Sequence, residues 1–166
     1  MAMRLLSSPR SVAVEMIKLL DSAFTQGDLI DQFTAENPQA GAIVTMSGKV
    51  RATANGEAVK TLRIDHYPGV TSEQITIETD KAKTRFSLTG ALVIHRVGDI
   101  LPGETIVLVA TAAIHRREAF EGCDYLMDYL KSQAYFWKKE TTDKNARWIE
   151  PHARDYNDAA RWRDKQ

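Results

Sequence analysis

The residues with the clearest chemical potential are basic side chains at the ends of predicted helices and strands. His115 and Arg116 open a predicted helix, where positive charge opposes the helix dipole and a bound anion is the simplest explanation. Lys131 and Lys138 lie near its far end, seven residues apart, so both face one way if the helix continues. Two neighbouring ammonium groups lower each other's pKa, which makes one a better proton acceptor or nucleophile. Together with Arg51, which follows a predicted strand, they indicate an anion-binding site.

Each candidate also has a simpler structural explanation when it is considered alone. An isolated surface arginine such as Arg51 is usually solvated. Cys123 lies on the apolar face of the same helix, which favours an inert core thiol. Phe136 and Trp137 are typical core anchors, and His95 is typical of a satisfied, partly buried histidine. No residue of this group identifies a function by itself.

Hydrophobic periodicity predicts three helices that position these groups. They cover Asp28–Glu36, Ser72–Arg85 and Arg116–Ala134, and Thr71 is placed to cap the second. The third helix has an apolar face with residues at spacings of three and four: Phe120, Cys123, Met127, Leu130 and Ala134.

Strands are predicted where β-branched residues gather or apolar and polar residues alternate. These segments are Ala42–Val50, Val59–His66, Ala91–Val97 and Thr105–Ala112. The last two read as a hairpin-like pair around the turn at Pro102-Gly103. Residues 11–20 fit either period. The charged tail after Pro151 has apolar residues at the spacing of a short docking helix (Tyr156, Ala159, Ala160 and Trp162). Helices mixed with hairpin-connected strands predict an α+β fold rather than a doubly wound parallel sheet.

Composition restricts the classes of function. The chain has 166 residues, with 22 Lys+Arg and 22 Asp+Glu, so no global field favours nucleic acid or an anionic membrane. A single cysteine excludes an internal disulfide, and the four histidines are too scattered for a zinc set (His66, His95, His115 and His152). No apolar run is long enough to span a bilayer, and the first ten residues lack the apolar core of a secretory signal. We therefore expect a cytoplasmic protein with no metal site.

Taken together, six segments resemble the large, catalytic subunit of molybdopterin synthase. They occur in family order and at family spacing between about Gly41 and Glu150: GAIVTMSGKVR, DHYPGV, IHRVGDILPGE, HRREAF, MDYLKSQAYFWKKE and RWIE. The resemblance implies an α/β hammerhead fold with an antiparallel sheet, a long helix and a small β subdomain. It divides the chain into an N-terminal segment that packs on the core (1–40), the catalytic core (41–150) and a charged tail (151–166).

The resemblance also implies an enzyme of molybdenum-cofactor biosynthesis. In this family, cyclic pyranopterin monophosphate receives two sulfurs and becomes the dithiolene of molybdopterin. The sulfur is carried as a thiocarboxylate on the C-terminal Gly-Gly of a small ubiquitin-like subunit, whose tail enters a pocket of the large subunit. Two large subunits form a homodimer with one small subunit at each end, a heterotetramer. Because this chain contains no Gly-Gly, the sulfur donor must be a separate chain. The resemblance also implies that the enzyme uses no cofactor.

The same resemblance gives roles to the basic residues. Arg51, His115 and Arg116 match positions that bind the substrate phosphate and pterin, and Lys131 and Lys138 match two catalytic lysines that also contact substrate. Lys131 is assigned to polarising the carrier's terminal carbonyl, and Lys138 to proton transfer or charge stabilisation on the pterin. We therefore expect five cationic side chains to converge in space around two anionic reactants.

Two positions depart from the family pattern. Tyr135 stands where family members usually have proline, so the path from Lys131 to Lys138 is expected to be more helical here. After Trp148 the family often has a basic residue that reaches the neighbouring subunit's pocket. His152 or Arg154 is the candidate for that contribution, and His152 makes it sensitive to pH.

Two other classes of function stay open on the residues alone. A non-catalytic dimeric scaffold that binds the tail of a ubiquitin-like protein would use the same pocket, but it needs no arginines beside the lysines and should not bind a pterin. An RNA- or nucleotide-binding α+β domain would use the basic cluster. Zero net charge and the lack of alternating aromatic and basic residues on a strand weigh against it.

Overall fold

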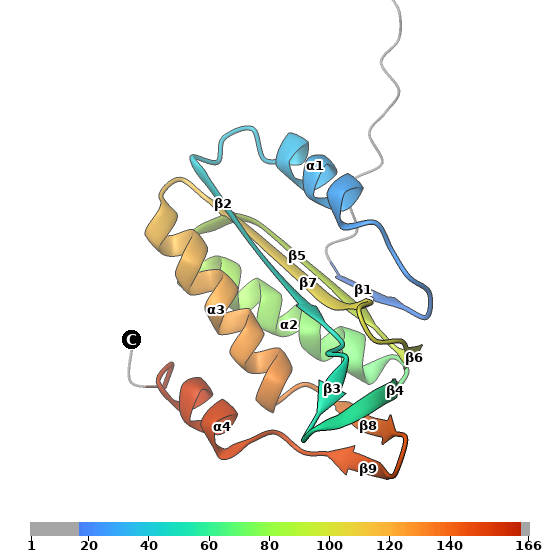
Figure 1. The fold of residues 1–166 in the computed structure, drawn as a ribbon. Helices are drawn as coiled ribbons and strands as arrows, with labels where there is room; N and C mark the ends of the chain where they lie inside the picture. Colours follow the sequence, from blue (N-terminus) through green and yellow to red (C-terminus); the bar gives the residue numbers. More distant parts are fainter. Residues whose placement is uncertain (1–16, 164–166) are drawn as a thin grey trace, which may run out of the picture.

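Two β-sheets and four helices make up residues 17–163, the part of the chain that this computed structural model describes (Figure 1). The helices are α1 (Gln26–Glu36), α2 (Val70–Arg85), α3 (Arg116–Ser132) and α4 (Ala153–Ala160). The strands are β1 (Ile17–Leu20), β2 (Ala42–Lys49), β3 (Thr53–Ala54), β4 (Glu57–His66), β5 (Leu88–Arg96), β6 (Gly98–Ile100), β7 (Thr105–Ala113), β8 (Phe136–Thr142) and β9 (Ala146–Ile149). The α+β prediction is confirmed.

The sheet β1-β5-β7-β2, called the larger sheet because its four strands contain more residues, is covered on both faces; the smaller sheet has five strands, β3-β4-β8-β9 with β6 paired to β4. The central strands β5 and β7 are antiparallel neighbours and almost entirely buried, as the hairpin-like pair predicted. The short strand β6 lies between them in the sequence but pairs with β4 in the smaller sheet. Alternate residues point to opposite faces of a sheet. Val93 and Val109 pack with α2 and α3, whereas Leu92 and Leu108 pack with Phe33 of α1. Helices α2 and α3 thus cover one face of this sheet and α1 covers the other (Figure 1).

The first described strand adds one parallel pairing to this sheet. β1 runs parallel to β5, with Ile17 opposite Val93, whereas the other strand pairs of the described chain are antiparallel. The ambiguous segment 11–20 therefore ends as a strand, while residues 11–16 lie outside the described part of the chain.

Helix α3 packs on the larger sheet, but its apolar face differs from the prediction. Ala119, Cys123, Leu126 and Leu130 are buried against the core. The prediction that Phe120 lies on the buried face is wrong: it is about 100° around the helix from the buried Ala119 and is 59% exposed. The remaining buried positions of the helix are Gly122 and Tyr129.

Thr71 does not cap α2 as predicted. The helix begins two residues earlier than predicted, at Val70, with Gly69 as its N-cap in a left-handed conformation (φ 81°). The Thr71 hydroxyl accepts a hydrogen bond from the Tyr67 N–H (2.9 Å) and donates one to the Tyr135 carbonyl (3.0 Å). It therefore ties the start of α2 to the connection that follows α3.

The predicted helical path from Lys131 to Lys138 is also wrong. Helix α3 ends at Ser132, where the Tyr129 carbonyl accepts hydrogen bonds from the N–H groups of Gln133 and Ala134 (2.9 and 3.0 Å). The next residues form β8, which pairs antiparallel with β4 and β9 in the smaller sheet. Pairing with β4 decides the conformation of this segment, so the absence of proline at Tyr135 does not prolong the helix.

The smaller sheet and the tail complete the fold. β4 is its central strand, and a separate apolar cluster includes Leu62, Ile64 and Ile100. The predicted docking helix is confirmed as α4, which lies along α3 (Figure 1). Ala159 and, just after the helix, Trp162 are buried, although Tyr156 is 53% exposed. Across residues 17–163, no helix combines the length and apolarity needed to cross a membrane.

Gly122→Ala tests how closely α3 approaches the sheet. A Cβ at this position would lie 2.8 Å from Leu88 Cδ1, and Leu88 is itself buried in the core. We expect the variant to lose about 1–3 kcal/mol of unfolding free energy in urea titrations. Gly27→Ala is the matched control, because Gly27 lies in α1 and an added Cβ there would meet no atom within 4 Å. This variant should gain up to about 1 kcal/mol of unfolding free energy. Equal stability of Gly122→Ala and wild type would contradict the close approach.

Candidate active site

A pocket of about 230 Å³ lies where the end of α3 meets the smaller sheet and the segment that leads into α4. Arg51, Lys131 and Lys138 line it, three of the five cationic residues expected to converge. Arg51 follows β2, Lys131 is in the last turn of α3, and Lys138 is in β8. A larger hollow of about 710 Å³ between α2, α3 and α4 contains none of the five. The smaller pocket is therefore the candidate active site.

Lys138 is held in the middle of the smaller sheet. Its backbone lies between Ile64 of β4 and Ile149 of β9, so the side chain leaves a fixed strand rather than a flexible loop. Burial lowers the pKa of Lys138 to about 8, with a further lowering from Lys131, while Asp155 acts in the opposite direction. An amine that exchanges its proton near neutral pH is suited to proton transfer.

An aromatic stack lies beside Lys138. The rings of Phe136 and His95 are 4.0 Å apart and nearly parallel, and His95 is only 2% exposed, more buried than the sequence predicted. His95 Nδ1 lies 2.7 Å from the Arg96 carbonyl, so this nitrogen carries the hydrogen and donates it. Burial and then Lys138 lower the pKa of His95 to about 3. The imidazole is therefore neutral and adds no positive charge beside the lysine.

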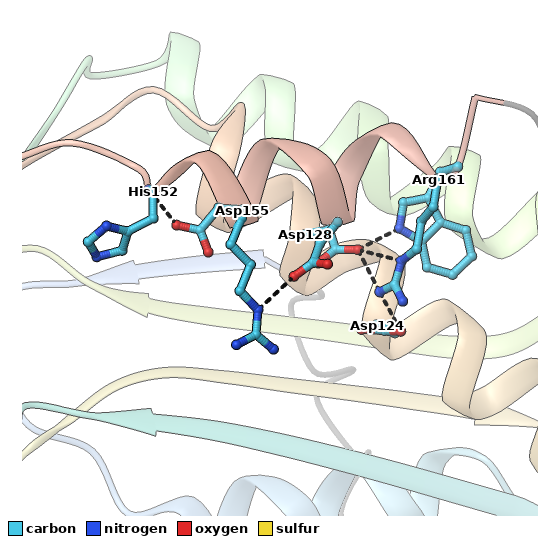
Figure 2. Close-up of polar contacts among 8 residues, drawn as sticks. Asp124, Asp128, His152, Asp155 and Arg161 are labelled. Atoms are coloured by element: carbon cyan, nitrogen blue, oxygen red, sulfur yellow. Dashed lines mark hydrogen bonds and ion pairs between the residues drawn. The ribbon is translucent and has the colours of Figure 1, made fainter.

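The start of α4 forms another wall of the pocket. His152 and Asp155 both line it, and the His152 backbone N–H donates a hydrogen bond to Asp155 Oδ2 (2.8 Å; Figure 2). Arg154, the other candidate for a contribution from the tail, does not line this pocket; it lines an adjoining hollow with Lys131 and His152, and its Nε lies 3.6 Å from Asp158 Oδ2. Asp155 was missed from the sequence. Its signal was the capping-box spacing, an acid three residues after the residue that caps the helix.

His115 and Arg116 do not reach this pocket within one chain. They are exposed at the opposite end of α3. The fifteen residues from Arg116 to Lys131 correspond to about 22 Å along a helix. A single chain therefore brings together the arginine and the lysine pair but leaves the other two predicted substrate-binding residues outside the pocket.

Two further expectations concern the remaining candidates. Burial and, to a smaller extent, Asp124 raise the pKa of Cys123 to about 11, so the predicted inert core thiol is confirmed. Phe136 is a partly buried pocket residue, whereas Trp137 is 47% exposed and is not a core anchor. The described residues contain no group of three or more His, Cys, Asp or Glu side chains that could hold a metal ion.

Comparison with known proteins gives a consistent set of relatives. The model of the family described as MoaE protein matches residues 20–133. A molybdopterin synthase catalytic subunit from Caulobacter vibrioides is 52% identical over 147 residues, which is 89% of this chain and 97% of the relative. Another, from Escherichia coli, is 43% identical over 128 residues, covering 77% of this chain and 85% of the relative.

Solved structures show the same fold. The molybdopterin biosynthesis MoaE protein from Burkholderia ambifaria superposes with a TM-score of 0.76 at 36% identity, covering 90% of this chain and 99% of that chain. A complex of subunits 1 and 2 of molybdopterin-converting factor from Helicobacter pylori contains a chain with a TM-score of 0.69 at 21% identity, covering 81% of this chain and 90% of that chain, which shows the fold alone. Sequence and structure thus agree that the chain belongs to the MoaE family of molybdopterin synthase catalytic subunits.

Proposed function

We propose that this chain is the catalytic subunit of a molybdopterin synthase. It transfers sulfur from the C-terminal thiocarboxylate of a small ubiquitin-like subunit to cyclic pyranopterin monophosphate and so forms the dithiolene of molybdopterin. The observation that carries the proposal is the meeting of Arg51, Lys131 and Lys138 in one pocket of a chain from this family. The proposal includes a cytoplasmic location, which is where the pathway of these bacterial relatives operates.

The pocket suits a reaction between two anions. A pterin phosphate and a thiocarboxylate repel each other, so the protein must supply positive charge where they meet. The Arg51 guanidinium can bind phosphate through two parallel hydrogen bonds, which an ammonium group cannot do. Lys131, which is exposed, polarises the terminal carbonyl of the carrier, and the more buried Lys138 transfers a proton to the pterin or stabilises its charge.

A second copy of the chain supplies His115 and Arg116 in this proposal. Three observations support it. The two residues are exposed, and Arg116 is about 22 Å from Lys131 along the helix. The exposed apolar side chains of Ile114 and Phe120 lie beside them. Strand β2 is at the edge of the larger sheet, and its outer side pairs with no strand within residues 17–163. A two-fold symmetric dimer presents the same patch twice and completes two pockets at once.

The sulfur donor is a separate chain. The H. pylori relative was solved as a complex of two different subunits, and we propose the same kind of pairing here. No Gly-Gly pair occurs among the 166 residues, so none of them matches the motif that carries the thiocarboxylate in this family. The proposed assembly is a dimer of this chain with one carrier subunit at each pocket.

Lys131→Ala and Lys138→Ala test the two catalytic assignments. With a thiocarboxylated carrier and the cyclic pterin substrate, each should reduce dithiolene product by about 100-fold or more, because a positioned acid or charge is lost from the pocket. Product is measured by mass spectrometry, and circular dichroism and carrier binding should be unchanged. Lys144→Ala, an exposed lysine outside the pocket, is the matched control. Full activity in either variant would remove that lysine from the mechanism. Failure of the wild-type chain to bind the cyclic pterin would instead favour the non-catalytic scaffold.

Mixing of inactive variants tests the second copy. Arg51→Ala and Arg116→Ala should each be inactive alone, yet a refolded equal mixture should recover about a quarter of wild-type activity, because half of the dimers then contain one intact pocket. An equal mixture of Arg51→Ala and Lys138→Ala should recover none, since both residues belong to the pocket of one chain. Recovery in both mixtures, or in neither, would contradict the shared pocket.

The pH dependence tests Lys138 directly. Because burial and Lys131 lower the pKa of Lys138 to about 8, kcat/KM should show an ionisation near pH 8. Activity that falls above this pH identifies the ammonium form as active, and activity that rises identifies the amine. Lys138→Arg should lose this ionisation, since a guanidinium keeps its proton across the range. A wild-type profile that is flat from pH 7 to about 9 would exclude a titrating Lys138.

A further inference from the structure

Asp155 is unexpected in a pocket built for anions. Its carboxylate lines the same wall as His152 and opposes the effect of Lys131 on Lys138. A negative charge here weakens the attraction for an anionic substrate unless it serves the lysines themselves. Two ammonium groups in one partly buried pocket are costly without a counter-charge.

We propose that Asp155 is a further positioning residue of the site: it supplies the counter-charge that keeps Lys138 protonated beside Lys131, and the docking of α4 on α3 places it there. This inference rests on the proposed function for its catalytic meaning. Its physical content concerns the charge of Lys138 alone.

The start of α4 holds the Asp155 side chain in place. Asp155 is at the third position of the helix, where its Oδ2 accepts the hydrogen bond from the His152 backbone N–H (2.8 Å). This contact satisfies an N–H that the helix itself leaves free. The carboxylate therefore has a defined place at the pocket wall, and Figure 2 shows it beside His152 at the start of the helix.

The other end of α4 is clamped onto α3. Arg161 Nη2 lies 2.6 Å from Asp124 Oδ2 and 2.8 Å from Asp128 Oδ2 (Figure 2). The Trp162 indole N–H donates a hydrogen bond to the same Asp128 oxygen (2.6 Å). Trp162 is 6% exposed and packs its ring against Phe86 and Tyr125. Ion pairs that are partly exposed stabilise little by themselves, so the buried indole anchors the helix and Arg161 sets its position along α3.

Asp155 is the carboxylate that acts on Lys138 among several charged neighbours. Glu140 also lines the pocket, but its Oε1 is held by Arg147 Nη2 at 2.7 Å. His95 lies nearby but is neutral, so it neither attracts nor repels the Lys138 ammonium group as a charge. The titratable and charged groups that face Lys138 across the pocket are Lys49, Arg51, Lys131, Glu140, Glu150, His152 and Asp155.

Labelling of single lysines tests the inference without substrate or carrier. The full chain is treated with acetic anhydride over a range of pH, and the acetylation rate of Lys138 is followed by peptide mass spectrometry. In Asp155→Asn the labelling profile of Lys138 should move to lower pH, so that Lys138 reacts severalfold faster at neutral pH, because the counter-charge is lost. Arg161→Gln should move the profile in the same direction and by less, since Trp162 keeps the helix docked.

Two controls make the result specific. Asp158→Asn removes the same charge from the same helix. Asp158 pairs with Arg154 and lines a neighbouring hollow that Lys138 does not reach, so the Lys138 profile should stay at its wild-type position. Asp155→Glu keeps both the charge and a side chain suited to the capping position, so it should retain the wild-type profile even if Asp155→Asn fails to fold. A Lys138 profile that is unchanged in Asp155→Asn, shifted equally in Asp158→Asn, or shifted in Asp155→Glu would overturn the proposal.

The activity assay is read separately. If wild-type chain makes no dithiolene while Asp155→Asn still shifts the Lys138 labelling, the proposed function fails and the role of Asp155 in setting the charge of Lys138 stands. If the enzyme is active, the ionisation of kcat/KM near pH 8 should move to lower pH in Asp155→Asn and stay in place in Asp158→Asn.

Discussion

The antiparallel pairing of β8 with β4 is the constraint on which the candidate site depends. Helix α3 carries Lys131 to one end of the larger sheet, and a three-residue connection then turns the chain into the smaller sheet. Opposite Ile64, Lys138 returns to the neighbourhood of Lys131 from a different element. The Thr71 hydroxyl, which donates to the Tyr135 carbonyl, fixes this turn to the start of α2. Both sheets, α2 and α3 therefore determine how far apart the amines of Lys131 and Lys138 lie.

Charge inside the pocket is governed by what is buried beside it. His95 stays neutral because it is enclosed between a strand and the Phe136 ring, and its Nδ1 hydrogen is donated to a backbone carbonyl. Lys138 is partly desolvated and faces another lysine, so its proton is held less tightly than that of a free amine. Asp155 moderates this effect from the start of α4. The pocket thus combines basic side chains with one amine, that of Lys138, which titrates near physiological pH.

The tail of the chain contributes more than its composition implies. A run of charged residues after Pro151 is typical of a solvated end, yet Trp162 is buried and Arg161 bridges two carboxylates of α3. This docking brings the 150–155 segment to the pocket, and it explains why residues distant in sequence from the lysines line the same wall. The other end of α3 carries the two basic residues that one chain leaves outside the pocket.

The sequence by itself determined the α+β class, most elements, the family and the residue types of the site, because hydrophobic periodicity and several motifs in family order are local properties. It correctly paired β5 with β7 and found the docking helix, but it extended α3 through Ala134 and placed Phe120 in the core. Only the tertiary structure decided that Lys138 is on a strand, that Asp155 faces it, and that His115 and Arg116 lie far from both. These outcomes depend on strand pairing and helix docking between distant segments, whose energies no local pattern of residues contains.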